Sequence, residues 1–384
     1  VDSVASKVPP MFQAPERLKV SCKEDIPTPS LVVDLNQVTH NVRAMADYAK
    51  THGLALRPHT KTHKSLTMAS LQLEHGATGV CVAKLGEANV MAEIADDLLL
   101  GYPIVDNYRA DRIAQLANSK KIRLAVDTMQ AVECISAAAA AAKSTIGILI
   151  DIDVGYHRTG AQDPESALAL AKAVESQSAL RLDGLFCFPG HIAGPPDQQD
   201  AELAAMDRIL LQVIDLWREH GLAATIVSGG STPTSRTSHQ VTALNEIRPG
   251  SYIYSDWNCV SGNWYQLNDC AASVLATVVS DAVPGKVVID AGSKTLTQDR
   301  HFLQPDTGGF GHVVEYPQAR IIHLTEEHGE VDITACDQRP QVGQRIHVIP
   351  NHICPCVNLQ NSFWLQHGPD DFECLPVEAR GCVV

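Results

Sequence analysis

Short runs of apolar residues recur through the first two thirds of the chain, separated by stretches of mixed polarity. Continuous apolar runs of this length are typical of strands buried on both faces, as in a parallel sheet. The segments between them, for example 38–53 and 200–221, place apolar residues at three-to-four spacing and end in glycine, which predicts amphipathic helices. The apolar runs cover residues 30–35, 54–59, 78–85, 97–102, 122–128, 146–153, 182–188, 224–230 and 251–256.

Strand and helix alternate about eight times over residues 27–265, which predicts an α/β fold of the (β/α)8 TIM-like barrel type. An alanine run at 137–142 has high helix propensity and is expected to form one of the barrel helices. Nine candidate strands are one more than the ring holds, and the pattern does not tell which lies outside it. Beyond 265, period-two alternation with Gly and Pro at the turns predicts a mainly antiparallel β domain. We expect a barrel domain over 27–265 and a β domain formed by 1–26 and 266–384.

Composition and charge exclude several classes of protein. The 384 residues are 45% hydrophobic and 19% charged, which is typical of a globular and not a disordered chain. A formal net charge of -14 argues against nucleic acid and anionic membranes as partners. The eleven cysteines have no regular spacing, so we expect buried, reduced thiols in an intracellular protein. The chain begins with Val and not Met, which leaves a cytoplasmic or an organellar location open.

Polar residues follow several of the predicted strands, at the end where a barrel holds its active site. His59 and Lys61 follow the second apolar run, Arg158 follows the sixth, and His191 follows the seventh. We expect His59 and Arg158 to contact a cofactor, and His191 is a candidate general base. A lone histidine at a strand end is also commonly a hydrogen-bonded structural residue.

Lys61 is the candidate for a reactive amine. Partial desolvation inside a barrel, with a cationic neighbour such as Arg57, would favour the free amine that Schiff-base formation needs. The alternative is an ordinary solvated lysine, and the local sequence does not decide between them. His59 and Arg57 would support Lys61, whereas His63 and Lys64 are expected at the surface or at the start of the following helix.

Two glycine-rich turns follow the predicted seventh and eighth strands. Glycines let backbone N–H groups approach a phosphate, serine and threonine hydroxyls add donors, and late-strand loops are where barrels bind phosphate. One such turn is often a plain turn, but two of them opposite a candidate Schiff-base lysine suggest pyridoxal 5′-phosphate (PLP). The expected cofactor contacts are Ser228, Gly229, Gly230, Ser231 and Thr232 in the first turn and Gly250, Ser251 and Tyr252 in the second.

His352 and Cys354 are candidate metal ligands in the predicted β domain. Two positions apart on an extended segment, they would point to the same side and could bind one divalent ion. This pair favours Zn, and oxygen ligands from substrate and water would admit Mn or Mg. Cys356 could be a third ligand or a bystander, and the alternative is a buried histidine beside buried cysteines. His328, in the sequence EEHG, can equally belong to a hairpin turn.

The motifs RPHTK, DVGYHRTG, SGGSTPT, RPGSYIYSD, DAGSK, EEHG and PNHICPCVNL together resemble those of a known family. It is the branch of alanine-racemase-fold (fold-type III) PLP enzymes that contains D-threonine aldolases, D-serine dehydratases, and 3-hydroxyaspartate aldolases and dehydratases. The resemblance extends from TPSLVVDL to VEARG. It implies PLP bound to Lys61, a divalent metal (Zn, Mn or Mg) at His352 and Cys354, and a homodimer.

The activity that this resemblance implies is that of a lyase acting on small D-configured β-hydroxy-α-amino acids. FPGHI and the VNL after the cysteines are most similar to D-threonine aldolases, which release glycine and an aldehyde, with His191 or hydroxide at the metal removing the hydroxyl proton. Cys354 is the form frequent among the dehydratases, which would instead use Lys61 to remove the α-proton and give a keto acid and ammonia. A non-catalytic PLP-binding protein is a further alternative, although it would have no use for a metal pair.

Overall fold

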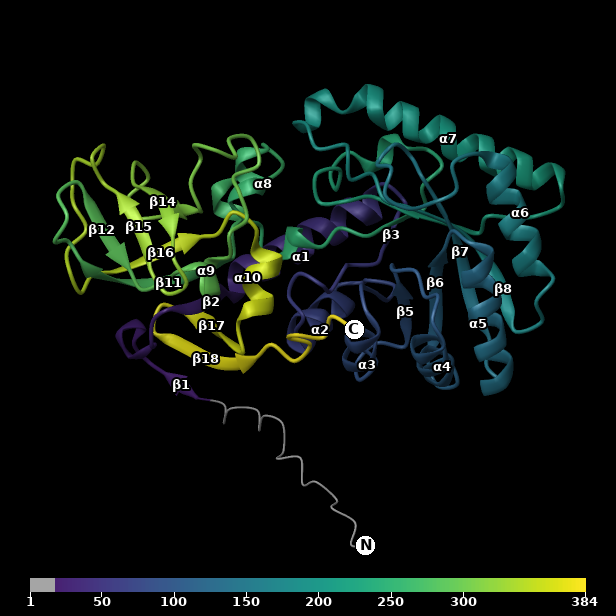
Figure 1. The fold of residues 1–384 in the computed structure, drawn as a ribbon, viewed down its shortest axis with the longest axis horizontal. Helices are drawn as coiled ribbons and strands as arrows, with labels where there is room; N and C mark the ends of the chain where they lie inside the picture. Colours follow the sequence, from purple (N-terminus) through teal and green to yellow (C-terminus); the bar gives the residue numbers. More distant parts are fainter. Residues whose placement is uncertain (1–17) are drawn as a thin grey trace, which may run out of the picture.

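The computed structural model describes residues 18–384 as a barrel domain beside a β domain (Figure 1). The barrel strands are β3 (Ala55–Leu56), β4 (Val80–Val82), β5 (Asp97–Leu100), β6 (Lys121–Val126), β7 (Ile146–Ile152), β8 (Leu180–Cys187), β9 (Ile226–Gly229) and β10 (Glu246–Ile247). The helices around them are α1 (Leu35–Thr51), α2 (Leu66–Glu74), α3 (Leu85–Met91), α4 (Asn107–Leu116), α5 (Met129–Ala142), α6 (Pro164–Glu175) and α7 (Asp200–Glu219).

The eight barrel strands are parallel and lie in the order β3-β10-β9-β8-β7-β6-β5-β4. A parallel bridge between His59 and Cys81 joins the two ends of this order. There the Cys81 N–H donates to the Pro58 carbonyl at 2.8 Å, and the Thr60 N–H donates to the Cys81 carbonyl at 2.9 Å. The ring is therefore closed, and the predicted (β/α)8 barrel is confirmed. The alanine run lies in α5, as expected.

Of the nine candidate strands, one lies outside the ring, as their number required, and one is not a strand. Residues 30–34 form β2 (Ser30–Asp34), which pairs with strands of the β domain. Residues 251–253 form a 3-10 helix, and all of 251–256 is buried, so their apolar run reflects burial and not strand geometry. The eighth strand is instead β10, whose two residues are too short to produce a recognisable pattern.

The interior of the barrel is layered, because alternate residues of a strand point to the same side. Two positions before the middle layer, β5 and β6 carry Asp97 and Arg123, which belong to a charged layer. Two positions after it lie Asp127, which directly follows β6, and Asp151 in β7, and both line a cavity. The middle layer is apolar and consists of Cys81, Leu99, Ala125, Leu149 and Phe186.

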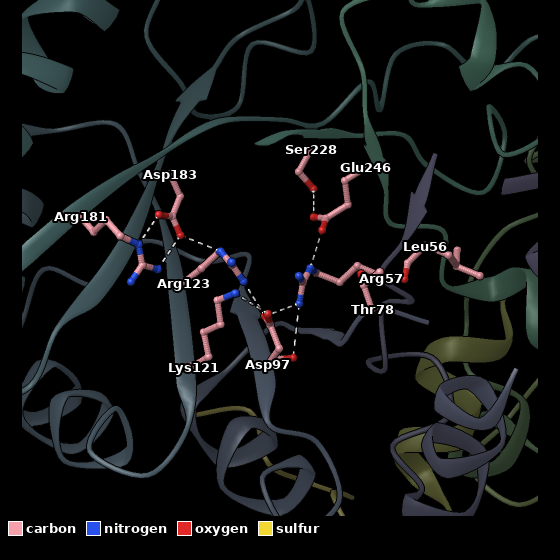
Figure 2. A network of polar contacts seen from close by, with 10 residues as sticks. All are labelled: Leu56, Arg57, Thr78, Asp97, Lys121, Arg123, Arg181, Asp183, Ser228 and Glu246. Atoms are coloured by element: carbon pink, nitrogen blue, oxygen red, sulfur yellow. Dashed lines mark hydrogen bonds and ion pairs between the residues drawn. The ribbon is translucent and has the colours of Figure 1, made fainter. Parts of the chain in front are cut away.

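The charged layer is a continuous set of ion pairs across the barrel interior (Figure 2). Arg57 pairs with Asp97 at 2.8 Å and with Glu246 at 2.9 Å, and Arg123 pairs with the same Asp97 at 2.6 Å. Buried charges are costly unless each is paired, and here every guanidinium has a carboxylate partner. The charged layer lies in the barrel interior on the side away from the cavity, and the apolar layer lies between the two.

The β domain contains a ten-stranded sheet in the order β1-β18-β17-β2-β11-β12-β15-β14-β13-β16. An additional pairing of β11 with β16 closes six of these strands into a second ring. All neighbours are antiparallel except β17 and β2, so the expected mainly antiparallel domain is confirmed. The remaining strands are β1 (Lys19–Val20), β11 (Ala272–Ser280), β12 (Lys286–Ile289), β13 (His312–Val313), β14 (Arg320–Leu324), β15 (Gly329–Asp332), β16 (Arg345–Ile349), β17 (Ser362–Gly368) and β18 (Asp371–Pro376).

Three short helices complete the fold: α8 (Trp257–Ser261), α9 (Ser293–Leu296) and α10 (Ile353–Leu359). All eleven cysteines are free thiols, five of them buried and six partly buried. Along residues 18–384, no helix has both the length and the apolar character that crossing a bilayer requires. The division at residues 27 and 265 stays a prediction, and residues 1–17 lie outside the described part of the chain.

Candidate active site

A cavity of about 640 Å³ opens at the carboxyl ends of the barrel strands and is also lined by residues of the β domain. This is the end at which barrels hold their active sites. The structure brings the lysine, the glycine-rich turns and the His-Cys pair into this one cavity. Ten of the predicted site residues line it: His59, Lys61, Arg158, Gly230, Ser231, Thr232, Gly250, Ser251, His352 and Cys354.

Lys61 lies on the turn after β3, is exposed to solvent and lines the cavity. The expectation that Arg57 supports it is wrong, because Arg57 is paired with Asp97 and Glu246 in the charged layer. His59 does lie beside Lys61, whose N–H donates to the His59 Nδ1 at 3.4 Å. Burial and the adjacent Lys61 cation hold the pKa of His59 well below its ordinary value, so its imidazole is neutral.

His63 and Lys64 are buried, which corrects their expected surface position. The Nε2 of His63 donates to Gln72 at 3.1 Å, and burial lowers the pKa of His63 to about 4. Lys64 forms a buried ion pair with Glu87 at 2.8 Å and donates to the carbonyl of Ala379, which is 315 positions away. The local sequence could not show this burial, because the covering segment comes from the far end of the chain.

The two glycine-rich turns lie against each other at the rim of the cavity. The Ser251 N–H donates to the Thr232 hydroxyl at 3.1 Å. Gly230 has a φ of +78°, a left-handed conformation that favours glycine. A Cβ at Gly250 would lie 2.9 Å from the Thr62 hydroxyl and 3.1 Å from the His59 carbonyl. The chain is therefore packed there so closely that only glycine fits.

Three of the expected cofactor contacts do not line the cavity. Ser228 is fully buried, donates to Glu246 at 2.6 Å, and accepts from Arg248 at 2.6 Å, so its hydroxyl belongs to the barrel interior. Gly229 faces the hydrophobic core, and Tyr252 is fully buried. The motifs identified the right loops, but the direction of individual side chains depends on packing.

His352 and Cys354 meet at the start of α10. His352 is the N-cap residue and Cys354 lies in the first turn, so the segment is not extended as expected. Both side chains nevertheless line the same cavity, and each affects the charge of the other. Burial opposes charge on both groups, but each stabilises the charge of the other. The pKa of His352 is therefore raised well above its ordinary value, and the pKa of Cys354 is lowered to about 7.

Asp256 orients this pair. Its carboxylate is 1% exposed and accepts from the His352 Nδ1 at 3.0 Å, from the Ile353 N–H at 3.1 Å, and from the Cys259 N–H at 2.9 Å. Burial acts to raise the pKa of Asp256, but the bond and charge of His352 and the bonds from Cys259 and Ile353 together outweigh it and hold the pKa below its ordinary value. Carboxylate-histidine pairs of this kind commonly fix a metal-binding imidazole, with the other ring nitrogen left for the ion.

Cys356 lies apart from the pair and is a bystander. It is fully buried, its thiol donates to the Thr295 carbonyl at 3.1 Å, and burial raises its pKa to about 12. His328 is exposed in the hairpin turn between β14 and β15. Among residues 18–384, no group of three or more His, Cys, Asp or Glu side chains converges as a metal site. Any ion at His352 and Cys354 would thus have open positions.

His191 does not line the cavity. It packs against Gly155, and its Nδ1 is buried without a hydrogen-bond partner in the described chain. Arg158, on the same loop as Gly155, does line the cavity and stacks on the rings of Phe188 and Tyr156 at 4.6 Å and 5.3 Å. The loop after β7 therefore presents Arg158 to the cavity and has His191 behind it.

Residues 33–257, more than half of the chain, match the family model "Alanine racemase, N-terminal domain", and residues 271–365 match "Putative serine dehydratase domain". A D-threonine aldolase of Arthrobacter sp is 30% identical over 341 residues, 88% of each chain. The crystal structure of D-threonine aldolase from Filomicrobium marinum aligns with a TM-score of 0.88 at 30% identity and covers 97% of this chain and 100% of that one. This chain belongs to the same family, that of the D-threonine aldolases and D-serine dehydratases.

The family of D-threonine aldolases and D-serine dehydratases consists of PLP-dependent lyases with the alanine racemase fold. Relatives of this chain also include 3-hydroxy-D-aspartate aldolases and D-serine dehydratases, which act on small D-amino acids. The D-threo-3-hydroxyaspartate dehydratase from Delftia sp. HT23 aligns with a TM-score of 0.85 at 26% identity, covering 92% of this chain and 97% of that one. Aldolases and dehydratases thus share the fold of this chain.

The cavity fits the PLP of this family. A volume of about 640 Å³ lies in the usual range of small-molecule sites. An exposed lysine amine opens into it, and the Gly250 position is close-packed in a way that only glycine allows. Ser231 and Thr232, whose hydroxyls are of the kind that bind phosphate, line the same cavity.

Three cavity residues that bear on the family's chemistry were missed from the sequence. Arg248 lies over the ring of Phe186 at 3.7 Å, and Asp151 is a buried carboxyl whose pKa burial raises to about 7. Asp256 is the third. Arg248 directly follows β10 and Asp151 lies near the end of β7, so strand-end polarity was a usable signal for these two, and Asp256 ends the segment RPGSYIYSD that begins with Arg248.

Proposed function

We propose that this protein is a PLP- and divalent-metal-dependent aldolase that cleaves D-threonine and related D-β-hydroxy-α-amino acids to glycine and an aldehyde. The observation that carries the proposal is that Lys61 and the His352-Cys354 pair open into one cavity. A lysine alone would serve many PLP enzymes. The adjacent His352-Cys354 pair could bind one metal ion and leave coordination positions open, as polarisation of a substrate hydroxyl needs.

Each group has a separate part in the proposed reaction. PLP held at Lys61 would act as an electron sink for electrons released at the α-carbon, and a divalent ion at His352 and Cys354 would acidify the β-hydroxyl. Asp256 holds the imidazole of His352 through its Nδ1, and the neutral imidazole of His59 stands beside Lys61. Arg158 supplies a cation at the wall of the cavity.

His191 is the proposed general base for the hydroxyl proton, following the sequence motif FPGHI. His191 lies behind the loop after β7, and in this role it would have to come within hydrogen-bond reach of the proton that it removes. We further propose a homodimer, on the basis of family membership. Light scattering on the purified protein would show a mass near 41.4 kDa if this is wrong.

The alternative is a D-serine or D-3-hydroxyaspartate dehydratase, which would use the same groups to eliminate the β-hydroxyl. A specific observation favours it: the metal pair contains Cys354, and a solved relative is a cysteine-to-alanine mutant of D-threo-3-hydroxyaspartate dehydratase in the metal-free form. That relative indicates a bound metal in its own family branch, and the His-Cys pair of this chain fits such a site. The metal itself is proposed as Zn, Mn or Mg.

Product identification separates the proposals. Purified enzyme with PLP and metal is incubated with D-threonine, D-serine and D-3-hydroxyaspartate, and with L-threonine as the control. Formation of glycine and acetaldehyde from D-threonine, but not from L-threonine, supports the aldolase. Formation of 2-oxobutyrate and ammonia from D-threonine identifies the dehydratase and contradicts the aldolase proposal. Bound PLP with no turnover of any of these substrates would point to a binding protein.

A further inference from the structure

The sulfur of Cys354 is contacted by two hydroxyls that come from two different parts of the site. The Thr62 Oγ1 lies 3.2 Å from it, and the Ser251 Oγ lies 3.4 Å from it. Thr62 immediately follows Lys61, and Ser251 immediately follows Gly250. The turn that carries Lys61 and Thr62, called the lysine turn below, and the second glycine-rich turn therefore both contact the sulfur of a candidate metal ligand.

The direction of these hydrogen bonds follows from the chemistry of a metal ligand. A cysteine binds a metal as the thiolate, which has no proton to give. Both hydroxyls must then donate to the sulfur, and two donors from different directions restrict where it can lie. Donors to a charged acceptor make stronger bonds than neutral pairs do.

Packing leaves the Thr62 hydroxyl little freedom to turn elsewhere. Thr62 is 0% exposed, and the Cβ position of Gly250 lies 2.9 Å from its Oγ1. Within the described residues, the contact with Cys354 is the hydrogen bond that this hydroxyl makes, and the same holds for the Oγ of Ser251. Both hydroxyls are thus committed to the sulfur by the fold.

We propose that Thr62 and Ser251 are positioning residues of the metal site, which hold the Cys354 sulfur in place so that metal affinity depends on the lysine turn. This inference rests on the metal pair of the proposed function. Neither residue need touch the ion, the cofactor or the substrate in this role. Outer contacts of metal ligands are commonly worth about 10–100-fold in metal affinity.

The test compares variants of the PLP-loaded enzyme by competition with a chromophoric chelator, using Zn²⁺ and Mn²⁺ separately. Thr62→Val keeps the shape of the side chain and removes the donor, so metal affinity should fall about 10–100-fold. Thr62→Ser restores the donor and should restore most of the affinity. Ser251→Ala should weaken binding by a smaller factor, because its contact is longer.

Thr60→Val is the matched control. Thr60 lies on the same turn and is equally buried, but its hydroxyl donates to the Cys81 carbonyl at 3.2 Å and does not reach the sulfur. Its metal affinity should equal that of the wild type. PLP content, measured after alkaline release, should be the same in the Thr62 and Thr60 variants, which separates a metal effect from a damaged cofactor site. Ser251 lines the cofactor cavity, so the metal affinity of Ser251→Ala is compared with that of the wild type at equal PLP occupancy.

If Cys354→Ala loses the metal while Thr62→Val binds it as tightly as the wild type, the positioning role is wrong and the metal site at His352 and Cys354 stands. If Thr62→Val does not fold, Ser251→Ala decides, and unchanged metal affinity there contradicts the positioning role. Failure of the proposed function gives a different result, because Cys354→Ala would then also retain the metal.

Discussion

The Nδ1 of His352 donates a hydrogen bond of 3.0 Å to the Oδ2 of Asp256. Asp256 belongs to the segment that leaves the barrel, whereas His352 caps α10 in the β domain. Because the carboxylate accepts the hydrogen bond from Nδ1, the Nε2 of the imidazole is the ring nitrogen that does not take part in this bond. The orientation of a metal-pair residue in one domain is therefore set by a buried carboxylate from the other.

Replacing Asp256 with Asn should weaken metal binding by about 10–100-fold. The amide cannot supply the negative charge that stabilises the imidazole, although its shape is nearly the same. Metal content after dialysis at limiting free metal measures the effect, and excess metal should restore activity. Asp215→Asn is the control, since Asp215 forms an exposed pair with Arg218 on α7. Equal metal retention in the two variants would disprove the role of Asp256.

The sequence was informative where chemistry follows directly from a strand end. His59, Lys61 and Arg158 could be placed in the cavity because a barrel gathers the residues after its strands on one face. His352 and Cys354 were identified from their spacing, although the segment that carries them is a helix start and not extended. The expectation survived a wrong local structure because residues at an N-cap and in the first turn can also converge.

The parts that could not be predicted depend on contacts between distant segments. Lys64 is buried by Glu87 and Ala379, which no local pattern connects to it. Arg57 was expected beside Lys61, but it lies four residues earlier in the chain and belongs to the ion pairs of the charged layer. β10 has two residues, and its partner strands, not its own sequence, make it a strand.

The Lys64–Glu87 pair should matter for stability. Its side chains are 6% and 1% exposed, and removing one partner of a buried pair commonly costs about 3–5 kcal/mol because the other charge is left unpaired. Lys64→Met should therefore lower the free energy of unfolding by that amount. The double variant Lys64→Met/Glu87→Leu should be less destabilised than Lys64→Met alone.

Denaturant titration of the two variants beside Lys294→Met provides the comparison. Lys294 forms an exposed pair with Glu327, of the kind that contributes about 1 kcal/mol or less. A Lys64→Met protein as stable as Lys294→Met would show that the buried pair contributes little.

His63 should make stability dependent on pH in the acid range. Burial lowers its pKa to about 4 from the ordinary 6.5, so between these values the unfolded chain takes up a proton and the folded chain does not. Its contribution is present above pH 6.5 and is lost as the pH falls through 4, by about 3 kcal/mol in total. His63→Gln should flatten this part of the stability profile.

His328→Gln serves as the control, because His328 is exposed in a hairpin turn. Its profile from pH 7 to pH 4 should follow that of the wild type. An identical acid loss in the wild type and in His63→Gln would mean that other groups carry it.

Gly250→Ala should weaken PLP binding. The added Cβ would lie 2.9 Å from the Thr62 hydroxyl and 3.1 Å from the His59 carbonyl, and overpacking of this kind commonly costs about 1–3 kcal/mol. If the strain is relieved by moving the turn, cofactor affinity should fall by about 5–100-fold, as measured by absorbance titration with PLP. Gly194→Ala adds a Cβ that meets nothing within 4 Å and should bind PLP normally. Normal PLP affinity in Gly250→Ala would show that PLP binding does not require the close packing of Gly250 against Thr62 and His59.

The central claim, that Lys61 and the His352-Cys354 pair form one aldolase site, is tested most directly by metal reconstitution. PLP-loaded enzyme is stripped with a chelator, metal is returned in steps, and glycine release from D-threonine is measured at each step. The account predicts that glycine release is lost on stripping, returns with one metal ion per chain in the wild type, and does not return in Cys354→Ala. Glycine release that continues at full rate in the stripped enzyme would contradict it.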